Sequence, residues 1–417
     1  MRLTHSLWKQ HLGRMAKKNW KAHGKKVIQE SDELKNLEQL GLPVIDINEV
    51  VKDMKIVERV KEEEPKDLKH WVEPPPVMNN LHPLYKARQC YMHKNNTVLI
   101  GGLDQAKIIA KAVEVKDGLP KMLEEKIEQL NVADMHKLVK RSILASHVFD
   151  AQQVKLPKLH DPSRPAWQFP RVYGISDQRR NYLLCEKLVQ LSNSWSQKSS
   201  ALFAVNNGRC VVPIEKEGDL IQFDLTLNMA LLSSVPHEKF SSQEEEENIY
   251  KIDLPDIYPL KHTVSCEKTH FYESKDIFPV NKFSKFSHLH TIIIHHNETQ
   301  IKNLHETKVL EGQLVGRCLL HGFAAAVSQA RQLFGEVEKE LPFPVSIQCI
   351  QTDGRLFDFS IFQLNTLDLN GSEGMKNMFW VLPRLELFSL CAYDEGRPTL
   401  QGYNPEVLKN FMAFCTH

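Results

Sequence analysis

One dipeptide, Asp353-Gly354, constrains the fold of this chain more than any other feature of its sequence. It lies between 343–352 and 355–367, two runs rich in β-branched and aromatic residues. An Asp-Gly pair favours the two-residue type I′ turn, because both central residues of that turn adopt a positive φ. The pair therefore predicts an antiparallel hairpin, in which Thr352 lies opposite Arg355 and Ile350 lies opposite Phe357.

Both faces of the predicted hairpin are apolar. Successive side chains of a strand point to opposite faces of a sheet. One face carries Phe357, Phe359 and Ile361, and the other carries Val345, Ile347 and Phe362. A sheet that is apolar on both faces is covered on both. We therefore expect the hairpin to be structural and to lie at the centre of its domain.

Further periodicities indicate the elements around the hairpin. Apolar residues between 319 and 333 recur at the helical period, and Gly335 stands where a C-cap glycine would. Residues 103–115 and 131–148 also favour helices, whereas 202–212 and 220–227 alternate as strands do. The sequence thus predicts an α+β fold. Its helices pack on a mixed or antiparallel sheet with a central C-terminal hairpin, and an extended basic N-terminal arm precedes them.

Composition shifts divide the chain into three predicted regions. Residues 1–76 form a basic arm and connector that ends in three consecutive prolines, which stiffen the chain. Residues 77–190 form a middle region of helices and strands. Residues 191–417 form a C-terminal α+β domain that contains the hairpin.

The positive charge of the chain is concentrated at its start. Residues 1–29 hold eight Lys and Arg and no acid, although the whole chain has a net charge of only +1. The other residues carry 45 of the 53 Lys and Arg against 52 Asp and Glu, a net charge of −7. A protein that wraps a nucleic-acid duplex would be basic over its body as well. We therefore expect any RNA contact to be local.

Residues 1–29 are also amphipathic and have three interpretations. They are a candidate mitochondrial targeting segment, because they are basic and acid-free. They could instead be an arm that stays on the mature protein and lies on RNA, or a solvated tail. The arm interpretation assigns RNA contact to five lysines: Lys17, Lys18, Lys21, Lys25 and Lys26.

A second basic stretch, 155–180, is rich in proline and interleaved with aromatic residues. Arginines fit phosphates, and aromatic rings stack on unpaired bases. Such aromatic residues pack equally well against a neighbouring protein, so both interpretations stay open. The candidate RNA-binding residues of this stretch are Arg164, Arg171, Arg179 and Arg180.

Recognisable catalytic and cofactor motifs are missing from the sequence. The eight cysteines are scattered without the CxxC spacing of zinc or redox sites. No dinucleotide loop, P-loop or GxSxG elbow occurs. Histidines cluster in 288–305, where we expect ordinary surface or edge residues and not metal ligands. The sequence therefore predicts no cofactor, metal, small-molecule substrate or membrane span.

The hairpin also offers an enzymatic alternative. Restriction-type nucleases hold magnesium with an acid at the start of one strand and with a carboxylate and a lysine on the next. Asp353 occupies the first position, but the later positions are Gln363 and Asn365. Neither provides the second carboxylate or the lysine that orients water. We therefore expect no nuclease activity, and we interpret these three residues as structural.

Several stretches together resemble a family of mitochondrial ribosomal proteins, which includes large-subunit protein 37 and programmed cell death protein 9. The resemblance covers about residues 80–410 and is strongest over 317–380. The matching residues are His82-Pro83-Leu84-Tyr85, Cys90-Tyr91, Gly118-Leu119-Pro120, Ser328-Gln329-Ala330-Arg331, Thr352-Asp353-Gly354-Arg355-Leu356-Phe357, Phe362-Gln363-Leu364-Asn365-Thr366, Lys376-Asn377 and Trp380.

The resemblance implies a non-catalytic constituent of the large subunit of the mitochondrial ribosome, in the matrix. Its implied partners are other large-subunit ribosomal proteins, the related family member and the large-subunit rRNA. The alternative is an RNA-binding or RNA-processing matrix factor with a degenerate nuclease-like fold. A third alternative is an interaction module outside mitochondria.

Overall fold

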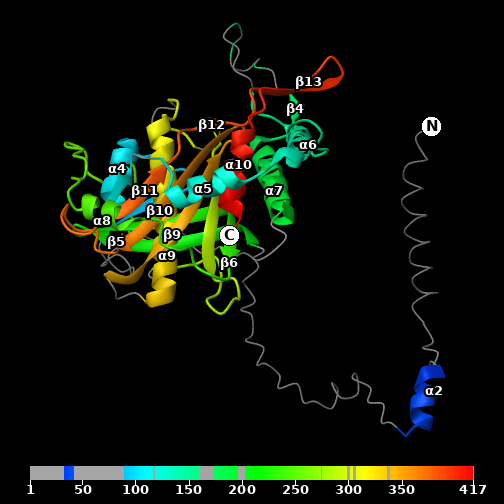
Figure 1. Ribbon diagram of the computed structural model, residues 1–417, viewed down its shortest axis with the longest axis horizontal. Helices are drawn as coiled ribbons and strands as arrows, with labels where there is room; N and C mark the ends of the chain where they lie inside the picture. Colours follow the sequence, from blue (N-terminus) through cyan, green and yellow to red (C-terminus); the bar gives the residue numbers. More distant parts are fainter. Residues whose placement is uncertain are drawn as a thin grey trace, which may run out of the picture. The chain divides into compact units, whose positions relative to one another are not determined.

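A mixed sheet of ten strands organises the second of two units, Met1–Pro76 and Val77–His417 (Figure 1). The computed structural model describes residues 32–41, 89–115, 118–158, 163, 165, 169, 172–195, 202–273, 275–297, 301–303, 307–335 and 339–416. In the first unit, the described helix is α2 (Asp32–Gln39). No helix in these ranges is long and apolar enough to cross a membrane.

The helices and strands of the second unit alternate along the chain. The helices are α4 (Gly102–Ala110), α5 (Lys121–Gln129), the short 3-10 helix η2 (Ala133–Met135), α6 (His136–His147), α7 (Asp177–Trp195), α8 (Gln243–Ile249), α9 (Glu311–Phe334) and α10 (Pro405–Cys415). The strands are β1 (Cys90–Lys94), β2 (Ala112–Val115), β3 (Val154–Lys155), β4 (Tyr173–Gly174), β5 (Phe203–Lys216), β6 (Asp219–Ser233), β7 (Glu267–Thr269), β8 (His288–His295), β9 (Glu340–Thr352), β10 (Leu356–Thr366), β11 (Asn377–Val381), β12 (Leu385–Glu386), β13 (Leu390–Asp394) and β14 (Arg397–Gln401).

The main sheet has the strand order β2-β11-β10-β9-β8-β6-β1-β7, with β5 paired to β6 and β12 to β10. The pairs β1–β6, β8–β9 and β2–β11 are parallel, and the other pairs are antiparallel. This mixed sheet, with helices packed on it, confirms the predicted α+β class. The boundary predicted near residue 190 falls between elements that share the sheet, because β1 and β2 precede that residue.

The β9–β10 hairpin lies inside the sheet, but its turn differs from the predicted type I′ geometry. Thr352 lies opposite Phe357, and Ile350 lies opposite Phe359, so the loop has four residues instead of two. Gly354 has a φ of +93°, whereas Asp353 is not among the residues with positive φ. The predicted turn and register are therefore wrong. The register differs by two residues, which is the side-chain period of a strand, so each side chain keeps its face.

The side chain of Asp353 explains the wider loop. Its Oδ1 accepts hydrogen bonds from the backbone N–H groups of Arg355 (2.8 Å) and Leu356 (2.6 Å). Aspartate commonly stabilises turns in this way. The two-residue turn with positive φ at both positions occurs instead between β5 and β6, at Glu217 (φ +52°) and Gly218 (φ +86°).

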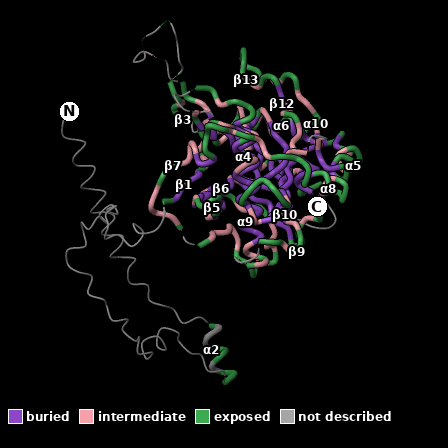
Figure 2. Tube along the Cα trace, turned by 90° about the vertical axis from the view of Figure 1, so that its left-hand side faces the viewer, coloured by how far each residue is buried: buried purple, intermediate pink, exposed green. Residues whose placement is uncertain are grey.

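The two faces of the sheet carry separate hydrophobic cores, which appear as buried segments inside an exposed periphery in Figure 2. Helices α4 and α9 cover one face, and α5, α6, α7 and α10 contribute to the core of the other. On the first face, Phe362 of β10 contacts Phe323 of α9, with ring centroids 5.8 Å apart. On the second, Phe359 contacts Phe414 of α10 at 5.2 Å. Coverage of both faces agrees with the predicted central position of the hairpin.

Candidate functional site

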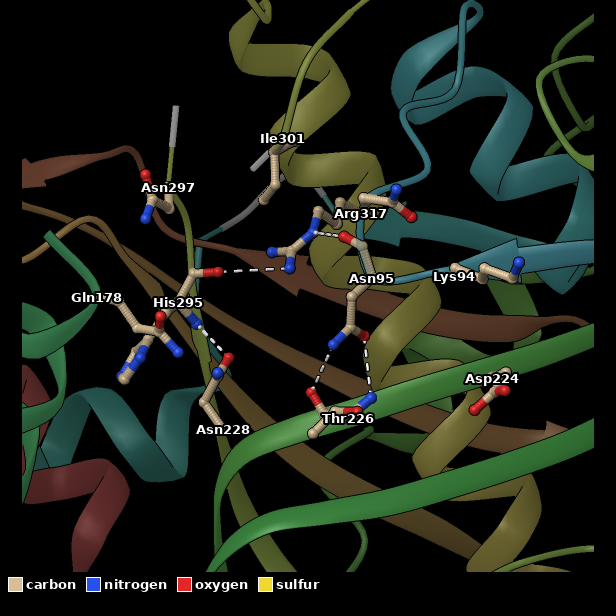
Figure 3. A pocket seen from close by; sticks show the side chains of 11 residues that line it. Lys94, Asn95, Gln178, Asp224, Thr226, Asn228, His295, Asn297, Ile301 and Arg317 are labelled. Atoms are coloured by element: carbon tan, nitrogen blue, oxygen red, sulfur yellow. Dashed lines mark hydrogen bonds between the residues drawn. The ribbon is translucent and has the colours of Figure 1, made fainter. Parts of the chain in front are cut away.

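A polar cleft lies where β1 and β8 end, beside β6 and the second turn of α9 (Figure 3). Its main lobe has a volume of about 550 Å³. Most of its lining side chains are amides or charged groups. They are Lys94, Asn95, Asn96, Gln178, Asp224, Thr226, Asn228, His295, Asn297, Ile301 and Arg317.

Arg317 is the buried cation of this lobe, with 4% of its surface exposed. Its Nε donates to the backbone oxygen of Asn95 (3.2 Å), Nη1 to Oε1 of Gln351 (2.9 Å) and Nη2 to the backbone oxygen of His295 (3.4 Å). All three acceptors are neutral, and none of the described carboxylates forms an ion pair with Arg317. Burial lowers the pKa of Arg317 to about 10, so the side chain stays charged at neutral pH.

The wall beside Arg317 is held by Asn95, which follows β1. Asn95 Nδ2 donates to the backbone oxygen of Thr226, and the N–H of Thr226 donates back to Asn95 Oδ1, both at 3.0 Å. This two-way contact ties the turn after β1 to the middle of β6. This contact positions the backbone oxygen of Asn95 that accepts from Arg317, and Figure 3 draws both sets of hydrogen bonds.

Next to the main lobe lies a second lobe of about 330 Å³, and His295 lines both. Its N–H donates to Asn228 Oδ1 (2.8 Å), while its side-chain Nε2 is buried without a hydrogen-bond partner. Burial, and secondarily the charge of Arg317, lowers the pKa of His295 to about 4, so the imidazole is neutral. The second lobe is lined by Gln152, Val154, Ser176, Gln178, Arg179, Tyr182, Asn207, Asn228 and His295.

A chain of polar side chains connects the cleft with the hairpin. Gln351 of β9 accepts from Arg317 and donates to Asp358 Oδ2 of β10 (3.2 Å). Asp358 also accepts two hydrogen bonds of 2.7 Å from Nε and Nη2 of Arg384. The hydrogen bond to Asp358 raises the pKa of Arg384. Asp358 and Arg384 therefore neutralise each other and leave Arg317 without a counter-charge.

The hairpin residues singled out from the sequence lie in two separate places. Asp353 and Gly354 form the loop, while Phe357 and Phe359 are buried on the α10 side of the sheet. Gln363 and Asn365 lie near the opposite end of β10. A strand rises about 3.3 Å per residue, so Gln363 lies roughly 23 Å along β10 from the loop.

Gln363 and Asn365 bind neighbouring segments of the same chain. Gln363 Oε1 accepts from the N–H groups of Phe240 (3.0 Å) and Ser241 (3.1 Å), and its Nε2 donates to Asn365 Oδ1 (2.9 Å). Asn365 Nδ2 donates to the backbone oxygen of Lys376 (3.0 Å). The two amides join β10 to the segments before α8 and β11, and they do not converge with Asp353.

Two of the candidate RNA-binding residues are described, and both form ion pairs within the chain. Arg179 pairs with Asp150 through Nε and Nη2, and Arg180 pairs with Asp177. Both arginines lie in the first turn of α7. The other candidates lie outside the described residues: Lys17, Lys18, Lys21, Lys25, Lys26, Arg164 and Arg171.

The prediction of surface or edge histidines is wrong for β8. This strand lies between β6 and β9 inside the sheet, so His290, His295 and His296 are 1%, 8% and 9% exposed. His305 lies outside the described residues. Throughout the described ranges, no group of three or more His, Cys, Asp and Glu could hold a metal ion.

Arg317 and Asp358 were not identified as site residues from the sequence, although a signal existed for each. Arg317 is a single cation within 314–320, an otherwise apolar stretch apart from Gly316. Asp358 separates two phenylalanines of a strand that is apolar on both faces. Isolated charges in such surroundings are buried, and buried charges require partners.

The C-terminal half of the chain is similar in sequence to a known protein family. Residues 220–417 match the family model described as "Mitochondrial 28S ribosomal protein S30 (PDCD9)". That range holds β6 to α10, including the central hairpin and Arg317. This part of the chain is similar to that family of mitochondrial ribosomal proteins.

Curated relatives extend the match over most of the chain. The chain is 28% identical to "Large ribosomal subunit protein mL37" of Rattus norvegicus over 353 residues, covering 80% of this chain and 77% of the relative. It is 29% identical to the protein of the same name from Mus musculus, with 80% and 76% covered. For the Bos taurus protein the identity is 27%, with 82% and 78% covered. The chain is thus a relative of the mL37 proteins.

Proposed function

We propose that the protein is a structural constituent of the large subunit of the mitochondrial ribosome, located in the matrix, and that it supports mitochondrial translation. The observation that carries this proposal is the match to relatives named mL37 over 80% or more of the chain. The family description names a 28S protein, but it matches a shorter range, 220–417. The large-subunit assignment follows the longer matches.

We also propose that the role is non-catalytic. The residues that the nuclease alternative requires are engaged in the fold: Asp353 in its loop, and Gln363 and Asn365 in contacts with neighbouring segments. Asp353→Asn keeps a good turn former and removes the carboxylate. The variant should fold and assemble as the wild type does. Loss of a magnesium-dependent nuclease activity in this variant, with folding unchanged, would contradict the non-catalytic role.

The proposed partners are other large-subunit ribosomal proteins, the related family member and the large-subunit rRNA. For RNA contact, the residues proposed from the sequence are Lys17, Lys18, Lys21, Lys25, Lys26, Arg164, Arg171, Arg179 and Arg180. To bind RNA, Arg179 and Arg180 would have to release their ion-pair partners, Asp150 and Asp177, and pair with phosphates instead. Each phosphate contact lowers the logarithm of the affinity by about 0.7–0.9 per tenfold rise in salt. Charge reversal of the five lysines should therefore reduce retention on salt-washed subunits.

Sucrose-gradient sedimentation of a mitochondrial lysate tests the central proposal. A tagged full-length chain should co-sediment with the large subunit, and it should remain in the large-subunit fractions when magnesium chelation separates the two subunits from each other. Asp353→Asn is a matched control that should sediment like the wild type. Recovery of the wild-type protein only in the top fractions of an intact gradient would overturn the proposal.

A further inference from the structure

Arg317 gives the cleft a positive charge that the described part of the chain does not neutralise. A buried cation is costly unless an anion and further hydrogen bonds compensate it. The carboxylate among the lining residues, Asp224, is already bound to Arg209, with Nε–Oδ1 and Nη2–Oδ2 distances of 3.0 Å. The lining cation Lys94 is likewise bound to Glu267 at 2.7 Å. Arg317 is therefore the one lining cation without an ion-pair partner in the described chain, and a single anionic group beside it would neutralise the cleft.

The second lobe offers neutral hydrogen-bonding groups and an aromatic ring instead of an unpaired charge. Of the side chains shared by the two lobes, Gln178 forms no hydrogen bond within the described chain, and Asn228 uses only its Oδ1. His295 Nε2 is buried without a partner. Buried polar atoms are normally satisfied, so an orphaned one indicates a missing partner. Tyr182 adds an aromatic ring to the wall of this lobe, and its hydroxyl is held by Asn206 Nδ2 at 3.1 Å.

These features match the parts of a nucleotide. Guanidinium groups bind phosphate oxygens. Amide side chains form hydrogen bonds with base edges, and aromatic rings stack on unpaired bases. A lobe of about 550 Å³ lies within the usual range of sites for small ligands, roughly 300–1,000 Å³. An acidic peptide would satisfy Arg317 but would make no use of the amides and the ring.

We propose that this cleft binds one nucleotide, whose phosphate pairs with Arg317 and whose base lies in the second lobe among Tyr182, Gln178 and Asn228. The nucleotide belongs to a single-stranded RNA segment or is a free nucleoside phosphate, and both present the same chemistry. The inference deepens the proposed function and rests on it for the RNA source. Subunit sedimentation and RNA binding by the purified protein are separate measurements, so either can fail without the other.

Asn228→Asp is the most informative variant, because substitution of Arg317 leaves the oxygens of Asn95 and His295 unsatisfied and can prevent folding. Aspartate at 228 keeps an oxygen to accept the N–H of His295 and adds a negative charge to the wall of the cleft. Asn281→Asp is the matched control. Asn281 Oδ1 also accepts a backbone N–H, from Phe283 (3.0 Å), but Asn281 is exposed and lines neither lobe.

The purified full-length protein is titrated into a fluorescently labelled uridine hexanucleotide and, separately, into fluorescently labelled uridine monophosphate, with hexaglutamate as the competitor of each. Both variants are first shown to melt like the wild type. We expect Asn228→Asp to weaken binding about ten-fold or more, because like charges repel, and Asn281→Asp to leave it unchanged. Binding of uridine monophosphate without binding of the hexanucleotide identifies a free nucleotide as the ligand, and binding of the hexanucleotide identifies an RNA strand. Equal binding by all three proteins, no binding of either probe, or equal displacement by hexaglutamate would overturn the proposal.

Discussion

Gly354 of the hairpin loop lies directly against Asn181 of α7. A Cβ atom built on residue 354 would come within 2.3 Å of Asn181 Oδ1. Asn181 is buried, and its Nδ2 donates to the backbone oxygen of His296 at 3.3 Å. The absence of a side chain at 354 therefore lets three segments meet: the loop, the first turns of α7 and the residue after β8.

Gly354→Ala should destabilise the protein in two ways. The substitution forces a φ of +93° on an L-residue, which costs on the order of 1–3 kcal/mol, and it displaces Asn181. Gly218→Ala is the matched control, since residue 218 has a φ of +86° in another hairpin turn but no atom within 4 Å of its Cβ position. Urea unfolding should give a larger loss for Gly354→Ala. An equal decrease in the free energy of unfolding for the two variants would show that the contact with Asn181 does not affect stability.

Phe359→Ala should lower the free energy of unfolding by about 3–5 kcal/mol, through lost apolar transfer and the cavity left behind. The ring is fully buried and contacts Phe414 of α10. Phe283→Ala removes the same atoms from a side chain that is 85% exposed, and it should change the stability by less than about 0.5 kcal/mol. Similar denaturation midpoints for the two variants would argue against a tightly packed α10 interface.

Arg384→Met should cost about 3–5 kcal/mol, because it leaves the carboxylate of Asp358 buried without its ion-pair partner. The side chains of Asp358 and Arg384 are 7% and 20% exposed. Arg355→Met breaks a pair of the same chemistry with Glu386, but these side chains are 52% and 42% exposed. Exposed pairs contribute up to about 1 kcal/mol. The double variant Asp358→Asn/Arg384→Met should regain part of the loss, and a purely additive result would refute the coupling.

Stability should fall as the pH decreases from 7 to 5. Burial is the main cause that lowers the pKa of His93 to about 3 and those of His147, His295 and His296 to about 4. The unfolded chain binds protons near pH 6.5, whereas the folded chain does not, so the stability is complete above that pH and is lost on acidification. At pH 5, each such histidine lowers the free energy of unfolding by about 2 kcal/mol relative to pH 7.

His93→Phe checks the assignment, because phenylalanine does not titrate and can keep the edge contact with Phe223, whose ring centroid lies 5.4 Å away. Urea unfolding at the two pH values should show a smaller difference for the variant than for the wild type. A wild-type free energy of unfolding that is the same at both values would contradict the neutral state of the buried histidines.

Residues 1–30 fused to a fluorescent reporter should direct it to mitochondria, because residues 1–29 are amphipathic, basic and free of acid. Replacing five lysines by glutamate (Lys17, Lys18, Lys21, Lys25 and Lys26) should abolish import. A diffuse cytosolic signal from the unmodified fusion would favour the alternative of a basic arm retained on the mature protein.

The alternating pattern of the C-terminal third predicted much of the fold correctly. The helix expected over 319–333 is the inner part of α9, and Gly335 is its C-cap with a φ of +93°. The helix expected over 103–115 was too long, because the chain turns at Lys111 (φ +44°) and β2 follows. Val113 and Val115 pair with β11, more than 260 residues away, and a local pattern cannot show such a partner.

The cleft was harder to predict than the fold, since it depends on segments that are distant in the sequence. Asn95, Thr226 and Arg317 come from three elements, and hydrogen bonds of Asn95 connect them. Residues 226–228 of β6 alternate polar and apolar side chains as in any half-buried strand, so their sequence alone does not mark a cleft. The isolated Arg317 was the one local signal, and its meaning required the neutral acceptors around it.

The segment that runs from β1 through α4 to β2 crosses over helix α9 near Gly316. These two strands belong to the same sheet, yet five other strands separate them in its order. Where α4 crosses α9 (Figure 1), a Cβ on Gly316 would lie 2.7 Å from the backbone oxygen of Gly102, so the two backbones touch. The amide protons of α9 around Gly316 lie beneath this crossing segment, so they should reach solvent only after it detaches. We expect them to be among the slowest to exchange with deuterium, at a rate set by the opening of β1–α4–β2 and not by fraying of α9 itself.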